Sequence, residues 1–469
     1  MDGHLKTPYD PRTFRALTWH DHTQAFADGS DSPRAYLERC LETVDAREPV
    51  VKAFPAINKD GARAAADAAT ARWRAGTPLS PIDGLPIAIK DLLETRDMPT
   101  QMGSAAFTGA FPKRDNAAVW ALRKAGAVVL AKTVTAELGG THPGPTTNPF
   151  DPARTPGGSS SGSAAAVAAR MVPAAIGTQV GGSIIRPAAY CGNVALKPSQ
   201  GALNRGERMS TSMSTHGPHA GCIEDMWQVA IEIAKRAGGD RDCRALKGPD
   251  TTPAAARPAR LMVLETAGWE RVDAATKAAF AELLGRLKAS GVEWVDRRGD
   301  AGVEAFEKVI LDAEEIATDV TLWENRWGWR NMVDEHGDKI SHRLRKGLEK
   351  AEAMTPADYE ALLDRRAAAQ AAHRNAATLA DCAITLSCPG PAPLWDASAA
   401  DADDVRRPTG DAIFNYPSSM LFAPVVTIPM MAVDGMPVGM QLMGRPGDDA
   451  KITGLARWIL ENVAPVVSD

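Results

Sequence analysis

Two glycine–serine segments and one lysine constrain this chain more than any other feature of its sequence. The first segment, Pro156–Ser163, reads P-G-G-S-S-S-G-S, and the second, Gln179–Arg186, reads Q-V-G-G-S-I-I-R. Upstream, Leu85–Ile89 is a short apolar run rich in isoleucine, which predicts a buried strand, and Lys90 ends it. A lysine at a strand end and serines on glycine turns are the parts that serine hydrolysis without histidine requires.

Lys90 has two interpretations. A lysine among apolar neighbours has its charged form disfavoured, which lowers its pKa and frees the amine to act as a base. The alternative is a strand-end lysine whose amine reaches solvent, and Lys90 taken alone fits this alternative better. The two serine segments shift the balance toward a base. Because neighbouring strand residues point to opposite faces, Asp91 need not contact Lys90.

The second segment predicts a turn into a short helix. Successive free N–H groups at Gly181 and Gly182 suit an oxyanion, because no side chain stands in front of them. Ser183 is expected at the start of that helix, where a serine commonly caps the first turn. A nucleophile and a capping serine can be the same residue.

The first segment also matches other glycine-rich patterns, which we reject. Gly158–Gly162 fits G-x-S-x-G, but that nucleophile turn must follow a buried strand, and Asn148–Pro156 reads as a loop. A phosphate-binding loop fails because no Gly-Lys-Ser/Thr follows the glycines. A flexible Ser/Gly linker remains, but the segment is short and an Ala-rich helix follows at once.

Three motifs together resemble those of the amidase signature family. They are G-L-P-I-A-I-K-D (Gly84–Asp91), P-G-G-S-S-S-G-S-A from Pro156 and G-G-S-I-I-R-P-A from Gly181, in the order and spacing of that family. The resemblance is strongest over about Lys52–Lys197 and extends weakly to Asp434–Pro446. It implies an α/β amidase signature fold with a large mixed central sheet covered by helices on both faces.

The resemblance also implies site residues. Ser183 would be the nucleophile, Ser159 the bridging serine that follows a cis peptide bond, and Lys90 the base. The N–H groups of Val180, Gly181, Gly182 and Ser183 would hold the oxyanion. For substrate binding we name Arg186, His142, Gly139, Gly140 and Thr178. The resemblance implies no cofactor, and we assign no metal.

The second segment departs from the spelling T-D-x-G-G-S-I-R that many members have. Gln179 replaces the acid, and the arginine stands one place later, at Arg186. That both changes occur together is expected if the acid and the arginine formed an ion pair, since a partner left alone is costly. This spelling resembles a bacterial subset that includes malonamidase, where the arginine faces the substrate. Arg186 is then either a carboxylate clamp or a structural donor to nearby carbonyls, and we weigh these evenly.

Composition agrees with a soluble enzyme. The chain has 469 residues, a net charge of −5 and six cysteines without C-x-x-C spacing. We expect no nucleic-acid partner, no membrane span, a cytoplasmic location and reduced cysteines in or near the core. No apolar leader segment begins the chain. A small-molecule amide is the expected partner, and a homodimer is one assembly that the sequence allows.

The pattern of helices and strands predicts one domain over residues 1–469. The core motifs lie in 52–230, a variable and mostly helical substrate-side region covers about 240–378, and 379–469 completes the fold. Strands alternate with helices, which indicates parallel strands. Trp323 and Trp327 share a helix face, and we favour burial in the core over a role as a pocket wall. His216 and His219 form a weakly metal-like H-x-x-H without a third ligand.

Three functions are compatible with these residues. The first is a hydrolase of small or aryl amides that uses Ser183, Ser159 and Lys90; carbamates and esters would use the same groups. The second is the glutaminase component of an amidotransferase, which the loss of the acid at Gln179 weakens. The third is a catalytically inactive assembly protein, which would be marked by loss of Lys90 or Ser183, and both are present.

Overall fold

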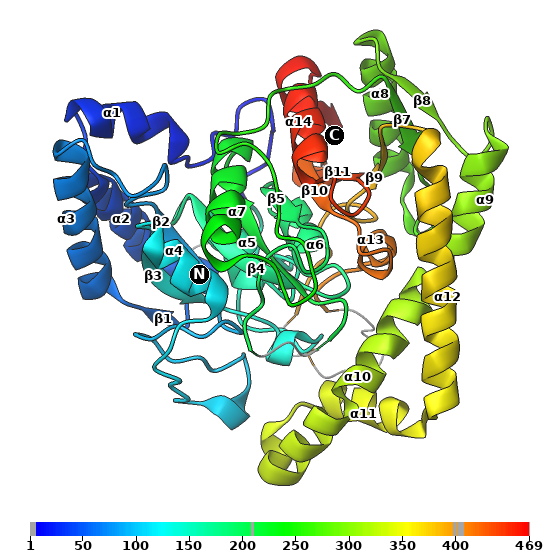
Figure 1. Cartoon of the computed structure of the whole chain (residues 1–469), viewed down its shortest axis with the longest axis horizontal. Helices are drawn as coiled ribbons and strands as arrows, with labels where there is room; N and C mark the ends of the chain where they lie inside the picture. The colour runs from blue at the N-terminus through cyan, green and yellow to red at the C-terminus, as the bar shows by residue number, and fades with distance from the viewer. Residues whose placement is uncertain (1–5, 208–210, 397–399, 401–407, 469) are drawn as a thin grey trace.

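One mixed sheet organises the molecule (Figure 1). The computed structural model describes residues 6–207, 211–396, 400 and 408–468. Within them the sheet has 12 strands in the order β1-β3-β2-β4-β6-β5-β10-β11-β9-β7-β8, with β12 beside β10. The strands are β1 (Ala56–Ile57), β2 (Pro86–Lys90), β3 (Val128–Thr133), β4 (Ala174–Gln179), β5 (Val194–Lys197), β6 (Thr215–Ala220), β7 (Arg260–Val263), β8 (Glu293–Val295), β9 (Cys382–Leu386), β10 (Val425–Val433), β11 (Met436–Met443) and β12 (Val466–Ser468).

The helices lie on both faces of this sheet, which confirms the predicted fold class. The longer ones are α1 (Thr23–Asp28), α2 (Pro33–Val51), α3 (Lys59–Arg74), α4 (Ala117–Lys124), α5 (Ser161–Ala168), α6 (Ile185–Tyr190), α7 (Ile223–Ala237), α8 (Ala274–Ala289), α9 (Ala301–Ile310), α10 (Ala313–His336), α11 (His342–Ala353), α12 (Pro356–Asn375), α13 (Tyr416–Met420) and α14 (Asp449–Asn462). The strand that carries Lys90 shows the layering: Ile87 and Ile89 pack in the core beneath α4 and α7, and Ala88 packs on the other face with α5. A strand buried on both faces explains the continuous apolar run in the sequence.

Local sequence signals set several helix ends. The Ser32 hydroxyl accepts a hydrogen bond from the N–H of Ala35, and Pro33 begins α2. Asp273 caps α8 in the same way through the N–H of Thr276. β7, α8 and β8 form a strand–helix–strand unit with β7 and β8 parallel, as the alternation of strands and helices in the sequence indicated.

Strands from both ends of the chain meet in the middle of the sheet. β10 pairs with β5 on one side and with β11 on the other, both antiparallel. The division of the chain into one domain with three regions stays our proposal, and this shared sheet supports it. The region 301–378 is mainly helical, and its helices α10 and α11 extend away from the sheet at the lower edge of Figure 1.

Three expectations need correction. Ser183 does not cap α6, because Ile184 holds the capping position. Trp327 is not in the core: 73% of its surface is exposed, while Trp323 is half-buried and stacks on Tyr359. Cys243 is exposed, although four other cysteines are buried as expected. A shared helix face shows which side chains are neighbours but not whether that face is covered.

In the part of the chain that the structure describes, no helix combines the length and the apolar character that a membrane crossing needs.

The sheet buries two lysines on neighbouring strands, and they differ in their partners. Lys132 on β3 lies 2.8 Å from a carboxylate oxygen of Asp91, and its amine also donates to Thr100 Oγ1. Lys90 on β2 forms no ion pair with any described residue. Both side chains are fully buried. The position of Asp91 confirms that it does not contact Lys90.

This difference predicts unequal effects on stability. Lys132→Met leaves the Asp91 carboxylate buried without its cation, so the free energy of unfolding should fall by about 3–5 kcal/mol. Lys90→Met leaves no buried carboxylate without its cation, so it should change the free energy of unfolding far less. Urea denaturation of both variants beside the wild type measures the contrast. Equal losses in the two variants would contradict it.

Candidate active site

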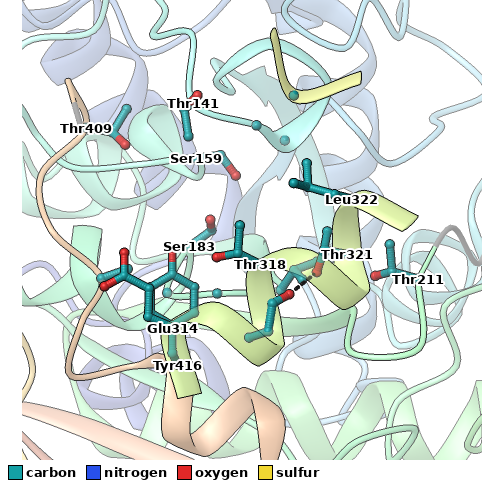
Figure 2. Close-up of a pocket in the computed structure, with 18 of the residues that line it drawn as sticks. Thr141, Ser159, Ser183, Thr211, Glu314, Thr318, Thr321, Leu322, Thr409 and Tyr416 are labelled. Atoms are coloured by element: carbon teal, nitrogen blue, oxygen red, sulfur yellow. Dashed lines mark hydrogen bonds between the residues drawn. The ribbon is translucent and has the colours of Figure 1, made fainter. Parts of the chain in front are cut away.

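A cavity of about 830 Å³ opens between the sheet core and the helices α10 and α11 (Figure 2). Ser159 and Ser183 both line it, so the structure brings the two glycine–serine segments to one place. The other expected substrate-binding residues line the same cavity: Gly139, Gly140, His142, Thr178 and Arg186. So do the glycine-turn residues Val180, Gly181 and Gly182.

Lys90 lies beneath this cavity, surrounded by hydroxyl groups. Its Nζ is 2.7 Å from Ser159 Oγ, 2.9 Å from Ser160 Oγ and 2.9 Å from Thr178 Oγ1. Ser160 Oγ also donates to the Thr178 carbonyl and accepts from the Thr178 N–H, both at 3.2 Å. Ser160 is therefore held as an acceptor toward Lys90. Our sequence reasoning did not assign it, since three consecutive serines do not reveal which one turns inward.

Electrostatics favour the neutral amine at Lys90. Burial lowers the pKa of Lys90 well below 10.5, and the nearby positive charge of Arg186 lowers it further. A neutral amine has two N–H groups and one lone pair. With Ser160 and Thr178 as acceptors of the two N–H groups, the lone pair remains for the hydroxyl proton of Ser159.

Backbone geometry fixes the Ser159 segment. The Gly158–Ser159 peptide bond is cis, as the family resemblance implied. Gly157 has a φ of 86°, and a Cβ there would lie 2.7 Å from the backbone of Pro187, so only glycine fits. The Arg186 guanidinium donates to the Gly158 carbonyl and, at 3.1 Å, to Thr409 Oγ1. Arg186 thus holds the loop that carries Ser159.

The Ser183 turn leaves its N–H groups available. Among the described residues we find no acceptor for the backbone N–H groups of 180–183. Gln179 Oε1 accepts the N–H groups of Ile184 and Ile185 at 2.8 and 3.0 Å, and so satisfies the start of α6 that Ser183 does not cap. A Cβ on Gly182 would lie 2.4 Å from the Asn415 amide oxygen, so this glycine is needed for the C-terminal segment to pack against the turn.

The helical insert forms the opposite wall and is tied to the core by a carboxylate. Glu137 is 4% exposed, and its carboxylate accepts the N–H of Ser341 at the start of α11 and the hydroxyl of Ser104. One residue earlier, the N–H of Ala136 donates to the Ser159 carbonyl. The start of α11 and the Ser159 loop are therefore joined through two consecutive residues, a connection that no sequence motif indicated.

The histidines divide between the cavity and the sheet. His142 is half-buried on the cavity wall. His216 and His219 are buried in β6, and burial lowers the pKa of each to about 3; the charge of Arg205 also lowers the pKa of His216. Among the described residues, no group of three or more His, Cys, Asp or Glu side chains is arranged to hold a metal ion.

The low pKa of Lys90 predicts a pH dependence of stability. Between that pKa and 10.5 the unfolded chain binds a proton that the folded chain does not, so the free energy of unfolding should rise with pH across this window. One such group contributes a slope of at most about 1.4 kcal/mol per pH unit. Denaturation at several pH values should give a flatter profile for Lys90→Met than for the wild type. Ser183→Ala, which keeps the lysine, should retain the wild-type slope; the prediction fails if Lys90→Met retains it as well.

The chain is similar to known proteins over most of its length. The family model described as amidase matches residues 35–453. A glutamyl-tRNA(Gln) amidotransferase component from Chloroflexus aggregans (strain MD-66 / DSM 9485) is 31% identical over 92% of this chain and 93% of its own length.

Solved structures are similar over nearly the whole chain. A crystal structure of an amidase has a TM-score of 0.80 at 28% identity and covers 96% of this chain and 100% of its own. An inhibitor-bound structure is described with a vestigial protein complex and the evolutionary origins of an s-triazine catabolic enzyme. It has a TM-score of 0.82 at 25% identity and covers 96% of this chain and 99% of its own. With the family model matched over most of its length, the chain belongs to the amidase family, whose members hydrolyse carbon–nitrogen bonds.

Proposed function

We propose that this protein hydrolyses neutral amides through an acyl-enzyme on Ser183, with Ser159 and Lys90 as the proton relay. The observation that carries the proposal is the buried amine of Lys90, 2.7 Å from Ser159 Oγ and without a carboxylate partner among the described residues, under a cavity that Ser159 and Ser183 share. A buried lysine kept neutral is suited to be a general base near neutral pH.

The proposed reaction uses these groups in order. Lys90 Nζ takes the proton of Ser159 as Ser159 takes the proton of Ser183, and Ser183 Oγ attacks the carbonyl carbon. The N–H groups of residues 180–183 stabilise the negative oxygen of the tetrahedral intermediate. The proton returns along the relay to the leaving nitrogen, the C–N bond breaks and the amine departs. Water then attacks the acyl group, gives its proton to the same relay, and releases a carboxylic acid and free Ser183.

A neutral substrate is favoured by how the cationic groups around the cavity are engaged. Arg186 donates to a backbone carbonyl and a threonine, Arg271 pairs with Glu314 and Asp411, and Lys350 pairs with Asp319. A substrate carboxylate would have to compete with these partners. We therefore propose the structural role for Arg186 rather than the carboxylate clamp, and with it a substrate unlike malonamate, although the segment has the malonamidase-like spelling.

The glutaminase component of an amidotransferase is the second candidate, because several relatives at about 31% identity carry an amidotransferase name. It would require glutamine as the ammonia source and a partner protein. Gln179 stands where many members have an acid, and here its side chain satisfies the first N–H groups of α6. Hydrolysis of free glutamine, with and without the other amidotransferase components, separates the candidates: release of ammonia that depends on those components favours the second.

Labelling tests the nucleophile. A fluorophosphonate probe should attach to Ser183, and Ser183→Ala should abolish both labelling and turnover while the melting temperature stays near that of the wild type. Mass spectrometry of the labelled peptide identifies the serine. An adduct on Ser159 or Ser160 instead would overturn the assignment.

Kinetics test the relay. Lys90→Met should lower kcat/KM on a neutral aryl anilide by about 10²–10⁴-fold, since a positioned acid–base group contributes that much. Ser160→Ala keeps the base but removes one acceptor that orients it, so its loss should be smaller. A panel of anilides, carbamates, esters and malonamate-like acids ranks the substrate classes. Turnover of Lys90→Met near the wild-type rate would refute the relay.

A further inference from the structure

The cavity that contains the reacting serines follows helix α10 along much of its length. The side chains of α10 that line it include a series at helical spacing: Glu314, Thr318, Thr321, Leu322, Asn325 and Trp329. A helix rises about 1.5 Å per residue, so the stretch from Glu314 to Trp329 is about 22 Å long. A substrate with one short substituent would occupy only part of this length.

The reacting serines lie between the two ends of this stretch. Ile184, which follows Ser183, packs in one apolar cluster with Ala317 and Val320 of α10. Figure 2 accordingly draws Ser183 and Thr318 between Glu314 and Leu322. The cavity therefore continues past the serines in two directions. We call these the Arg271 end, whose lining includes Arg271, Asp312, Glu314 and Glu315, and the α11 end, whose lining includes Leu138, Leu322, Trp329 and Leu344.

The Arg271 end is charged. Arg271 forms an ion pair with Glu314, and Arg365 forms ion pairs with Asp312 and Glu315. An apolar group placed at this end would lie among charged side chains, so it would gain little by leaving water.

The α11 end has an apolar wall where α10 meets α11. A Cβ on Gly347 of α11 would lie 3.3 Å from the ring of Trp329 and 3.4 Å from Leu322, so both side chains pack beside this glycine. Trp329 and Leu322 are half-buried and line the cavity, so part of each side chain stays open to its contents. An apolar group bound here would remove that surface from water.

Polar groups at the α11 end already have partners within the protein. The Asn325 amide donates to the Thr321 carbonyl at 2.9 Å, and the Arg343 guanidinium donates to the Ala400 carbonyl. The Glu137 carboxylate is occupied by the start of α11. A polar substituent would have to compete with these hydrogen bonds, whereas an apolar one would not.

Ser159 lies toward the α11 end. A Cβ on Gly139 would lie 3.9 Å from Ser159 Oγ, and the preceding residue, Leu138, lines the α11 end. The N–H of Ala136 also donates to the Ser159 carbonyl, next to the carboxylate of Glu137 that holds α11.

The Ser183 turn lies toward the Arg271 end. A Cβ on Gly182 would lie 2.9 Å from Ala412. Ala412 follows Asp411, and the carboxylate of Asp411 lies 2.6 Å from the guanidinium of Arg271. The direction from Ser183 to Ser159 is therefore the direction from the charged end to the apolar end.

Proton transfer decides which half of the substrate lies at which end. In the proposed reaction, the proton that leaves Ser183 returns through Ser159 to the nitrogen as the C–N bond breaks. The leaving nitrogen must then lie on the Ser159 side of the carbonyl carbon. Its substituent extends toward the α11 end, and the acyl group extends toward the Arg271 end.

We propose that the α11 end is the subsite for the leaving amine, and that the preferred substrate is a secondary amide whose nitrogen carries an apolar group. This inference rests on the proposed function. The carbon atoms of the amine would be buried against Leu322 and Trp329. Ammonia, the leaving group of a primary amide such as glutamine, would leave this end unfilled.

Two isomeric neutral amides test the inference. N-hexylacetamide carries its carbon chain on the nitrogen, and N-methylheptanamide carries it on the acyl group. The wild type should have a kcat/KM about tenfold or more higher for N-hexylacetamide, since each buried methylene contributes roughly fourfold. Trp329→Ala should lower kcat/KM for N-hexylacetamide by about tenfold and change that for N-methylheptanamide by less than about twofold.

Trp327→Ala is the matched control, because Trp327 lies on the same helix, is 73% exposed and is not among the residues that line the cavity. It should leave both values unchanged. Melting temperatures are measured for every variant, and if Trp329→Ala is destabilised, Leu322→Ala provides the same comparison.

Three results would overturn the inference while the proposed function stands. They are a wild-type preference for N-methylheptanamide or for neither isomer, a loss in Trp329→Ala and Leu322→Ala that is equal or absent for the two isomers, and turnover of a neutral anilide but of neither isomer. A loss in Trp327→Ala equal to that in Trp329→Ala would count against it in the same way. Wild-type turnover of no neutral amide would overturn the proposed function and this inference with it.

Discussion

Lys90 Nζ lies 2.7 Å from Ser159 Oγ, and it can accept the proton of that hydroxyl only if its amine is uncharged inside the protein. Burial disfavours the ammonium form, and a carboxylate neighbour would restore it. The sheet buries Lys90 and also keeps carboxylates away from it, because the Asp91 carboxylate lies against Lys132 instead. Strand alternation is the reason, since Lys90 and Asp91 are adjacent in sequence and face opposite ways. The position of one carboxylate therefore decides which of these two buried lysines has an ion-pair partner.

The rest of the site depends on segments that are distant in sequence. Thr409, Asn415 and Tyr416 reach the two serine loops from the C-terminal part of the chain. Arg186 joins the loops to one another, because it follows the Ser183 turn and donates to the Gly158 carbonyl. Neither loop is positioned by its own residues alone. Strands from the N-terminal and C-terminal parts share one sheet, and this brings the segments together.

The resemblance carried by three motifs predicted the fold class, because those motifs are specific to one family. The strand before Lys90 could be predicted from its apolar run, which is a local signal. The exposure of Trp327 could not be predicted, because helical spacing shows which side chains are neighbours but not whether another element covers them. Ser160 was missed for a related reason. Its role depends on which hydroxyl groups find acceptors, and that depends on contacts made by residues far along the chain.

Glu137 gives the Ser159 loop and the helical insert a common anchor. Its carboxylate accepts the N–H of Ser341 at the start of α11, and the N–H of its neighbour Ala136 donates to the Ser159 carbonyl. The insert has a second contact with the core, because α10 packs with Ile184 in one apolar cluster. In an exchange of inserts between relatives, a foreign insert would therefore have to fit at two places, with its helix start on Glu137 and with its preceding helix on Ile184.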